Sequence, residues 1–156
     1  MINQRQIETT IVNGLQEALG CPVIRQNQTA PIPDYPYVSY LISTPRVANN
    51  GTYGYYGNDS YAKPFSQVWS FTVQSDDCTE SQDLAAKAHE WFELTNGNYL
   101  DDNNIVVERL MNITSRDNLL TIEYEYRNGF DVQFALMDAI GVEPDEYIEV
   151  AELTYE

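Results

Sequence analysis

The sequence has little cysteine, little histidine and little positive charge, and each shortage argues against a class of function. Its two cysteines, Cys21 and Cys78, are too few for a disulfide framework, and they lack the paired spacing and the histidines of a zinc site. We expect both thiols to be reduced and buried. The motifs of nucleotide-binding proteins, zinc proteases and serine hydrolases are also absent. The sequence therefore predicts no bound cofactor, no metal site and no enzymatic activity.

Basic residues are far fewer than acidic ones. The chain has 8 lysines and arginines against 24 aspartates and glutamates, for a formal net charge of -16 at pH 7. A surface of this sign repels phosphate, which argues against specific DNA binding. Arg127 is the one base in the last forty residues, which hold eleven acids: Asp117, Glu123, Glu125, Asp131, Asp138, Glu143, Asp145, Glu146, Glu149, Glu152 and Glu156.

Long apolar runs are missing as well. No stretch approaches eighteen apolar residues, and the N-terminus lacks a basic region followed by an apolar segment. We therefore expect no membrane span, and synthesis in the cytosol. The 156 residues, 43% of them hydrophobic, predict one globular domain over 1–156, with a core over about 3–136 and an acidic C-terminal extension over 137–156.

Hydrophobic spacing predicts two main helices. Apolar residues recur every four positions through residues 3–19, and Gly20 stands where a helix commonly ends. The second helix is expected over 80–94, where apolar residues recur at three- and four-residue intervals. Thr79 and Gln82 have the spacing of a capping box at its start.

The remaining periodic segments predict strands. Alternating β-branched or aromatic residues indicate strands over 37–44 and 66–75, from 105, from 119, and, more briefly, over 21–26. Strands that run together between two helices, without βαβ alternation, predict an α+β fold. We expect an antiparallel β-sheet of four to five strands packed against the two main helices.

A segment rich in tyrosine, glycine and asparagine separates two of these strands. Residues 50–63 show neither strand nor helix periodicity and are expected to form a long exposed hairpin loop. Tyrosine offers a large, rigid contact surface, so this loop is a candidate subunit or partner interface. Local packing against the sheet is the alternative. The tyrosines concerned are Tyr53, Tyr55, Tyr56 and Tyr61.

Candidate catalytic and metal-binding residues are few. His89 lies beside the apolar stripe of the second helix, where a packing role is the simpler interpretation. Glu123 and Glu125 would share one face of a strand and could serve acid-base chemistry, but a solvated strand face explains them equally well. Residues 101–104 offer oxygen ligands for calcium, yet the glycine and the distal glutamate of an EF-hand are missing.

Three stretches, in this order and spacing, carry a resemblance to a known family: PIPDYPYVSYLIST, WSFTVQSDDCTESQDLAAKAHEWF and TIEYEYRNGFDVQFAL. Together they resemble the phage neck terminator, or tail terminator, proteins of tailed bacteriophages of Gram-positive hosts. The resemblance covers roughly residues 5–136 and implies a tail-terminator-like α+β fold. The segment after Met137 lies outside it and could form an added strand or an arm that binds a neighbour.

The resemblance implies a structural virion protein located in the neck. Such a protein would form a homo-hexameric ring that caps the tail tube and contacts the tail tube protein and the head-completion protein. DNA would pass through the ring without specific binding, which an acidic lumen would favour by repulsion. Arg127 and Asp131 flank an expected turn at Gly129 and are predicted to hold that strand in register or to form an inter-subunit salt bridge.

Three other functions compete with this prediction. A head-completion protein, either a stopper or an adaptor, would have similar size and acidity but would contact the portal side. A small hydrolase or metal-dependent enzyme would need His89 or an acidic pair to converge in a cleft. A monomeric ligand-binding module would use the tyrosine-rich loop.

Overall fold

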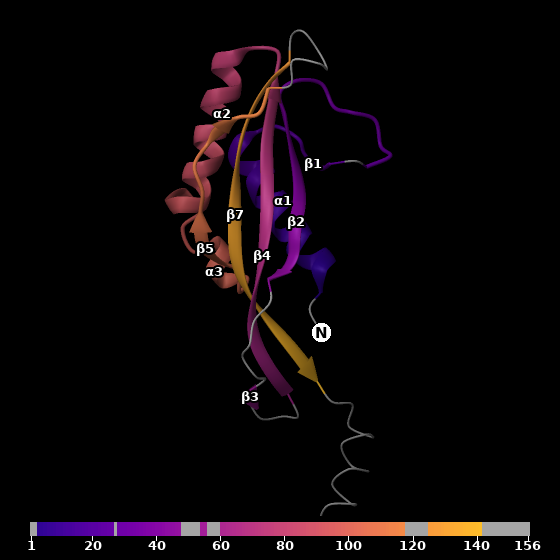
Figure 1. Ribbon diagram of the computed structural model, residues 1–156, viewed down its shortest axis with the longest axis vertical. Helices are drawn as coiled ribbons and strands as arrows, with labels where there is room; N and C mark the ends of the chain where they lie inside the picture. The colour runs from indigo at the N-terminus through magenta and orange to yellow at the C-terminus, as the bar shows by residue number, and fades with distance from the viewer. Residues whose placement is uncertain (1–2, 27, 48–53, 56–59, 118–124, 142–156) are drawn as a thin grey trace, which may run out of the picture.

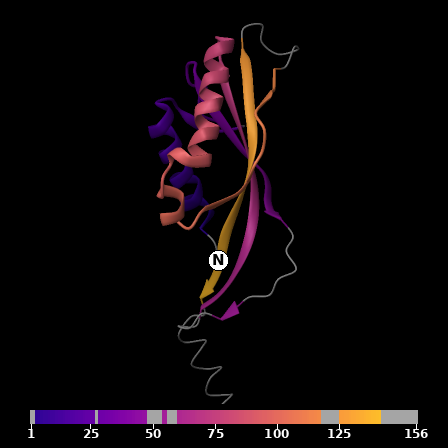
Figure 2. The same cartoon turned by 90° about the vertical axis from the view of Figure 1, so that its left-hand side faces the viewer.

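The chain folds into one twisted β-sheet with its helices gathered on one face, as Figures 1 and 2 show. The computed structural model describes residues 3–26, 28–47, 54–55, 60–117 and 125–141. The elements are α1 (Gln4–Leu19), β1 (Val23–Arg25), β2 (Tyr37–Val47), β3 (Gly54–Tyr55), β4 (Ser60–Ser75), α2 (Cys78–Glu90), the π-helix η1 (Trp91–Thr95), α3 (Tyr99–Asp102), β5 (Val106–Leu110), β6 (Thr114–Ser115) and β7 (Tyr126–Gly141).

The sheet is built around two long central strands, β4 and β7. Both have 16 residues, and they pair antiparallel along their whole length, from Ser60 opposite Gly141 to Ser75 opposite Tyr126. The main strand order is β1-β2-β4-β7-β5, while β3 pairs with β4 and β6 pairs with β7. The lower ends of β4 and β7 extend, with β3, beyond the helices as a narrow two- to three-stranded projection (Figure 1). We call this projection the ribbon; it consists of β3, residues 60–65 of β4 and residues 136–141 of β7.

Alternation along β4 and β7 places the aromatic core between the sheet and the helices. Trp69 and Phe71 of β4 and Phe130 and Phe134 of β7 are fully buried. The rings of Phe134 and Trp69 meet edge-on with their centroids 5.6 Å apart. Phe92 of η1 packs against Phe71, with ring centroids 4.9 Å apart. Because a strand presents alternate side chains to opposite faces, this apolar set defines one face and leaves the intervening residues on the other.

The first helix matches its sequence signals closely. Asn3 caps α1 by accepting a hydrogen bond from the Gln6 backbone N–H at 3.1 Å, and Gly20 ends it with a left-handed φ of 69°. Ile11, Leu15 and Leu19 form the buried stripe. Helix 3–19 was therefore predicted correctly.

The second helix begins earlier than predicted. Asp77, not Thr79, is its N-cap, and its carboxylate accepts from the Thr79 backbone N–H at 3.1 Å. The α-helix then continues directly into η1, in which Trp91 and Phe92 are buried. Since Cys78 is the first helical residue and is exposed, the prediction of two buried thiols was wrong for Cys78; Cys21 is half-buried.

One buried polar group links α2 to the sheet. The hydroxyl of Ser81, which has no exposed surface, donates to the Val73 carbonyl and accepts from Asn128 Nδ2, both at 3.0 Å. These bonds join the helix to both central strands. They satisfy three polar groups that would otherwise be costly to bury.

The α+β class and the packing of one sheet against helices are confirmed, with three differences of detail. β1 runs parallel to β2, so the sheet is mixed rather than antiparallel. Residues 60–64 are the beginning of β4 rather than loop, because they continue the pairing with β7. Gly129 lies inside β7 opposite Thr72, so the turn predicted there was wrong.

Candidate functional site

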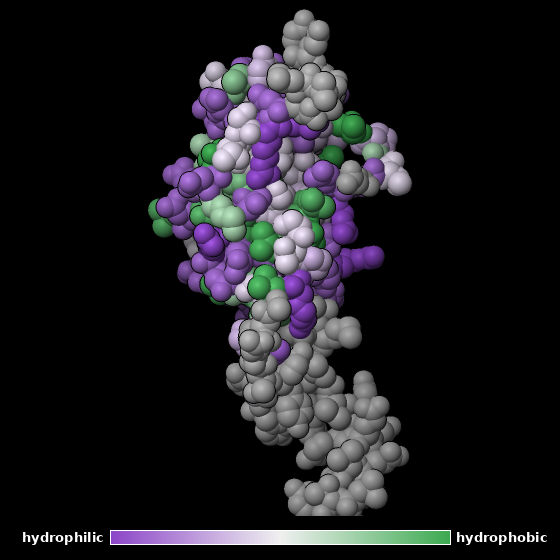
Figure 3. Space-filling model, viewed as in Figure 1, coloured by the Kyte–Doolittle hydropathy of each residue, from purple (hydrophilic) through white to green (hydrophobic). Residues whose placement is uncertain are grey.

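One side of the sheet faces away from the helices (Figure 2), and we call it the open face. Polar side chains of β2, β4, β5 and β7 lie on it and form hydrogen bonds there. Ser66 bonds to Glu108, Gln74 bonds to Ser39, and Ser43 bonds to the backbone carbonyl of Val68. Figure 3 shows this side, where hydrophilic and pale residues surround separate hydrophobic ones. A polar face of this kind suits contact with water or with a polar partner.

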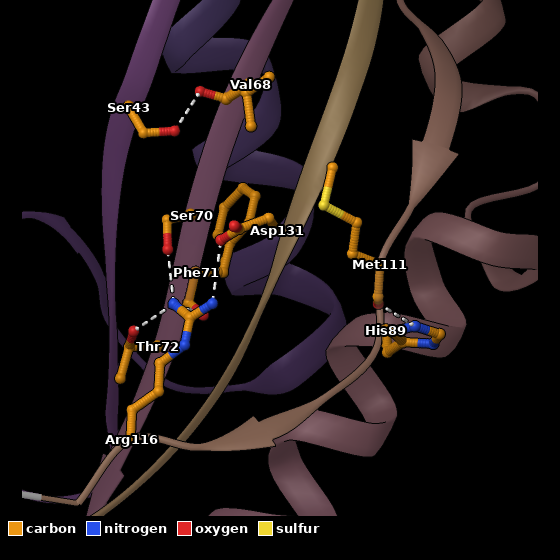
Figure 4. Close-up of polar contacts among 9 residues, drawn as sticks. All are labelled: Ser43, Val68, Ser70, Phe71, Thr72, His89, Met111, Arg116 and Asp131. Carbon is orange, nitrogen blue, oxygen red and sulfur yellow. Dashed lines mark hydrogen bonds and ion pairs between the residues drawn. The ribbon is translucent and has the colours of Figure 1, made fainter.

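Arg116 fastens the segment after β6 onto the open face (Figure 4). Its Nη1 donates to Ser70 Oγ at 2.5 Å and to Thr72 Oγ1 at 3.1 Å, and its Nη2 donates to Asp131 Oδ1 at 2.9 Å. Gly129 makes room for this arrangement, because a Cβ there would lie 3.0 Å from Arg116 Nη1 and 2.3 Å from the Phe71 carbonyl oxygen.

A second arginine-carboxylate pair lies close to the first, at the start of β7. The side chain of Glu125 is only 4% exposed, and its Oε2 accepts from Nε and Nη2 of Arg127 at 2.7 and 2.5 Å. Its Oε1 accepts from the Tyr35 hydroxyl at 2.9 Å. Burial and this bond to Glu125 raise the pKa of Tyr35 to about 12, and burial raises the pKa of Tyr37 next to it. Residues 28–36, which lead from β1 to β2 and include three prolines, are thereby tied to β7, and we call them the connector.

Between that connector and the sheet lies a groove of about 530 Å³. Among the described residues that line it, the only charged ones are Arg25, Arg116 and Arg127, so we call it the arginine groove. The rest of its lining is apolar or uncharged polar: Ile24, Gln26, Gln28, Ala30, Ile32, Tyr37, Ser39, Thr72 and Gln74. Sequence reasoning missed this groove because its walls come from four separate parts of the chain and share no local motif.

The predicted interface residues fall into two groups. Tyr53 and Tyr56 lie outside the described residues, whereas Tyr55 of β3 pairs with Tyr61 of β4 in the ribbon. The segment is thus partly strand, and its role as an interface stays a prediction. Arg127 and Asp131 do not pair with each other: Glu125 binds Arg127 and Arg116 binds Asp131. A role for either residue between subunits also stays a prediction.

His89 is occupied by packing contacts. Its Nε2 lies 3.0 Å from the Met111 carbonyl oxygen, its ring meets Phe130 edge-on at 5.1 Å, and Nδ1 is 3.8 Å from Glu93. Glu123, the proposed partner of Glu125, lies outside the described residues. Within the described ranges no three His, Cys, Asp or Glu side chains are grouped as metal ligands, and no helix is long and apolar enough to cross a membrane.

The comparisons with known proteins agree with this architecture. A search of curated proteins gave no match. One solved chain aligns with a TM-score of 0.51 at 12% identity, over 86% of this chain and 96% of its own length, which shows a shared fold. The sequence pattern of the family described as phage neck terminator protein matches residues 9–156, so it extends through the segment after residue 136, where we expected the resemblance to stop. The chain therefore belongs to the phage neck terminator protein family, whose members are structural proteins of the bacteriophage neck.

Proposed function

We propose that this protein caps the phage tail tube as a ring and joins the tail to the head-completion protein. The observation that carries the proposal is the family match over residues 9–156. A closed ring repeats one heterologous contact, so each copy needs a projecting part and a surface that receives it. The ribbon and the open face are two unlike surfaces of the kind that such a contact requires.

The distribution of charge supports passage of DNA without specific binding. Acidic side chains are exposed along α2, η1 and α3: Asp76, Asp77, Asp83, Glu90, Glu93, Asp101 and Asp102. Lys87 is the one lysine or arginine in that part of the chain. A channel lined by this helical surface would repel the phosphates of the duplex and let it slide. We therefore assign the α2-α3 side to the lumen.

Light scattering of the purified protein across concentration and salt, followed by negative-stain microscopy of large species, tests the ring. We expect a closed ring of six copies, favoured at higher salt because screening weakens repulsion between chains that each carry a charge of -16. Tail tubes polymerised with the protein present should end in such rings. A protein that stays monomeric at every salt concentration, and leaves tube length unchanged, would contradict this function.

A head-completion protein, either a stopper or an adaptor, is the alternative. It would share the size, the acidity and the neck location, so its partner is what distinguishes it. Co-sedimentation with purified tail tubes would support the terminator, whereas co-sedimentation with portal-bearing heads that lack tails would support the stopper or adaptor. The protein would be assembled in the host cytoplasm in either case.

A further inference from the structure

We propose that the arginine groove of one copy receives the acidic C-terminal segment, residues 142–156, of a neighbouring copy. This inference rests on the proposed ring and names one contact within it. The occupant is a segment of the chain itself, chosen by its charge, its apolar content and its reach.

The chemistry of the groove suits an acidic peptide. The chain has a net charge of -16, yet the only charged residues among the described lining of the groove are three arginines. The side chain of Arg25 is 57% exposed, and its contact with Glu8 is 3.5 Å long. Arg116 and Arg127 are fixed in position by Asp131 and Glu125. Arginine forms paired hydrogen bonds with carboxylates, so Arg25 is the residue best placed to bind an incoming one.

The C-terminal segment has the complementary composition. Residues 142–156 contain no lysine or arginine and six acids: Glu143, Asp145, Glu146, Glu149, Glu152 and Glu156. Apolar residues stand between the acids: Tyr147, Ile148, Val150, Leu153 and Tyr155. The groove offers apolar surface beside its arginines, because Ile24, Ala30 and Ile32 line it and Ile32 is 74% exposed. The groove is therefore complementary to the segment in charge and also offers apolar surface for its apolar residues.

Reach favours a neighbour over the same chain. Arg127 lines the groove near the start of β7, whereas the segment begins after Gly141 at the far end of that strand. Arg25, nearer to that end, lies level with Phe130 across the sheet, through Tyr40 and Phe71. The eleven positions from Phe130 to Gly141 span about 37 Å at about 3.4 Å each, and fifteen residues reach at most about 50–54 Å when fully extended. Within one chain, only the last few residues of the segment could reach Arg25, while a neighbouring copy removes this constraint.

A peptide-binding experiment tests the groove directly. The probe is a fluorescently labelled peptide of residues 142–156, and the receptor is the full chain carrying Glu143→Gln, Asp145→Asn, Glu146→Gln, Glu149→Gln, Glu152→Gln and Glu156→Gln. Anisotropy at low salt should show binding that weakens as salt is added. Arg25→Glu in the receptor should weaken binding by about tenfold or more, because it places like charges together. Lys87→Glu, which makes the same charge change on α2, should leave binding unchanged.

Failure of this inference can be told apart from failure of the ring. No binding of the peptide, or equal weakening by Arg25→Glu and Lys87→Glu, would overturn the docking whether or not rings form. We call the receptor with the six acid-to-amide changes the six-amide chain. If it formed rings as well as wild type does, the docking would be overturned but the proposed ring would stand. Repulsion alone predicts that the six-amide chain associates more strongly than wild type, whereas docking predicts that it associates more weakly.

Discussion

Arg116 and Asp131 form an ion pair across the open face, with Nη2 of the arginine 2.9 Å from Oδ1 of the aspartate. The same guanidinium bonds to Ser70 and Thr72 on the next strand. One side chain therefore joins the segment after β6 to both β4 and β7. It also forms part of the lining of the arginine groove, so the stability of the sheet and the shape of the groove depend on the same contacts.

Gly129→Ala tests whether the close approach of Arg116 requires a glycine. The new Cβ would lie 2.3 Å from the Phe71 carbonyl oxygen, which belongs to the backbone of a central strand and cannot move cheaply. We expect the free energy of unfolding to fall by about 1–3 kcal/mol, as for other overpacked sites. Urea denaturation followed by tryptophan fluorescence measures it. Gly20→Asn at the exposed end of α1 is the control, since asparagine tolerates a positive φ; an equal loss there would contradict this explanation.

Arg116→Lys tests the shared hydrogen bonds rather than the charge. A lysine keeps the positive charge but lacks the planar guanidinium that reaches Ser70, Thr72 and Asp131 together. We expect a loss of about 1 kcal/mol of stability, because the site is partly exposed. The matched substitution Arg109→Lys, at an exposed position of β5, should leave the free energy of unfolding nearly unchanged in the same urea titration. If both substitutions changed the free energy of unfolding equally little, Arg116 would stabilise the fold only through its charge.

The helices and the central strands could be predicted because their signals are local. Alternation identified β2 and much of β4, and four-residue spacing together with Gly20 identified α1. Gly129 was misjudged for a physical reason. A glycine is common in turns, but here it is required by the approach of Arg116, which is distant along the chain and invisible to a local pattern.

The candidate site was harder to predict than the fold. Arg127 and Asp131 were singled out from the sequence as residues that hold the strand in register or form a salt bridge between subunits. Within the chain, the structure pairs Arg127 with Glu125 and Asp131 with Arg116. Arg25 and Arg116 were not singled out, since an isolated arginine carries no motif. Their convergence in one groove depends on the parallel placement of β1 and on the path of the segment after β6, both of which are tertiary features.

Ser81→Ala tests the polar link between α2 and the sheet. The change removes the acceptor of Asn128 Nδ2 and the donor to the Val73 carbonyl, and both partners would stay buried without it. We expect a loss of about 1–3 kcal/mol of stability, which is the usual effect of leaving buried polar groups unsatisfied. Gln82→Ala, at the next and exposed position of α2, should change stability by less than about 0.5 kcal/mol. Thermal or urea unfolding of the two variants side by side distinguishes a buried link from a general effect on the helix.

Tyr40 should make folding stability depend on pH in the alkaline range. Burial, together with the 2.9 Å hydrogen bond that its hydroxyl donates to Glu8, raises its pKa from 10.0 to about 12. The folded state therefore favours the protonated phenol. Its contribution to stability is complete below pH 10, where the unfolded chain is also protonated, and is lost as pH rises from 10 through 12.

Tyr40→Phe removes that titration while keeping the ring stacked on Trp69, whose centroid lies 5.3 Å away. Between pH 10 and 12 the unfolding free energy of wild type should therefore fall more steeply than that of the variant, as measured by urea titrations at a series of pH values. All other ionisable groups are the same in both proteins, so their contributions cancel in the comparison. Parallel curves through this range would mean that the hydroxyl of Tyr40 loses its proton as easily in the folded protein as in the unfolded chain, and that its bond to Glu8 does not hold the proton in place.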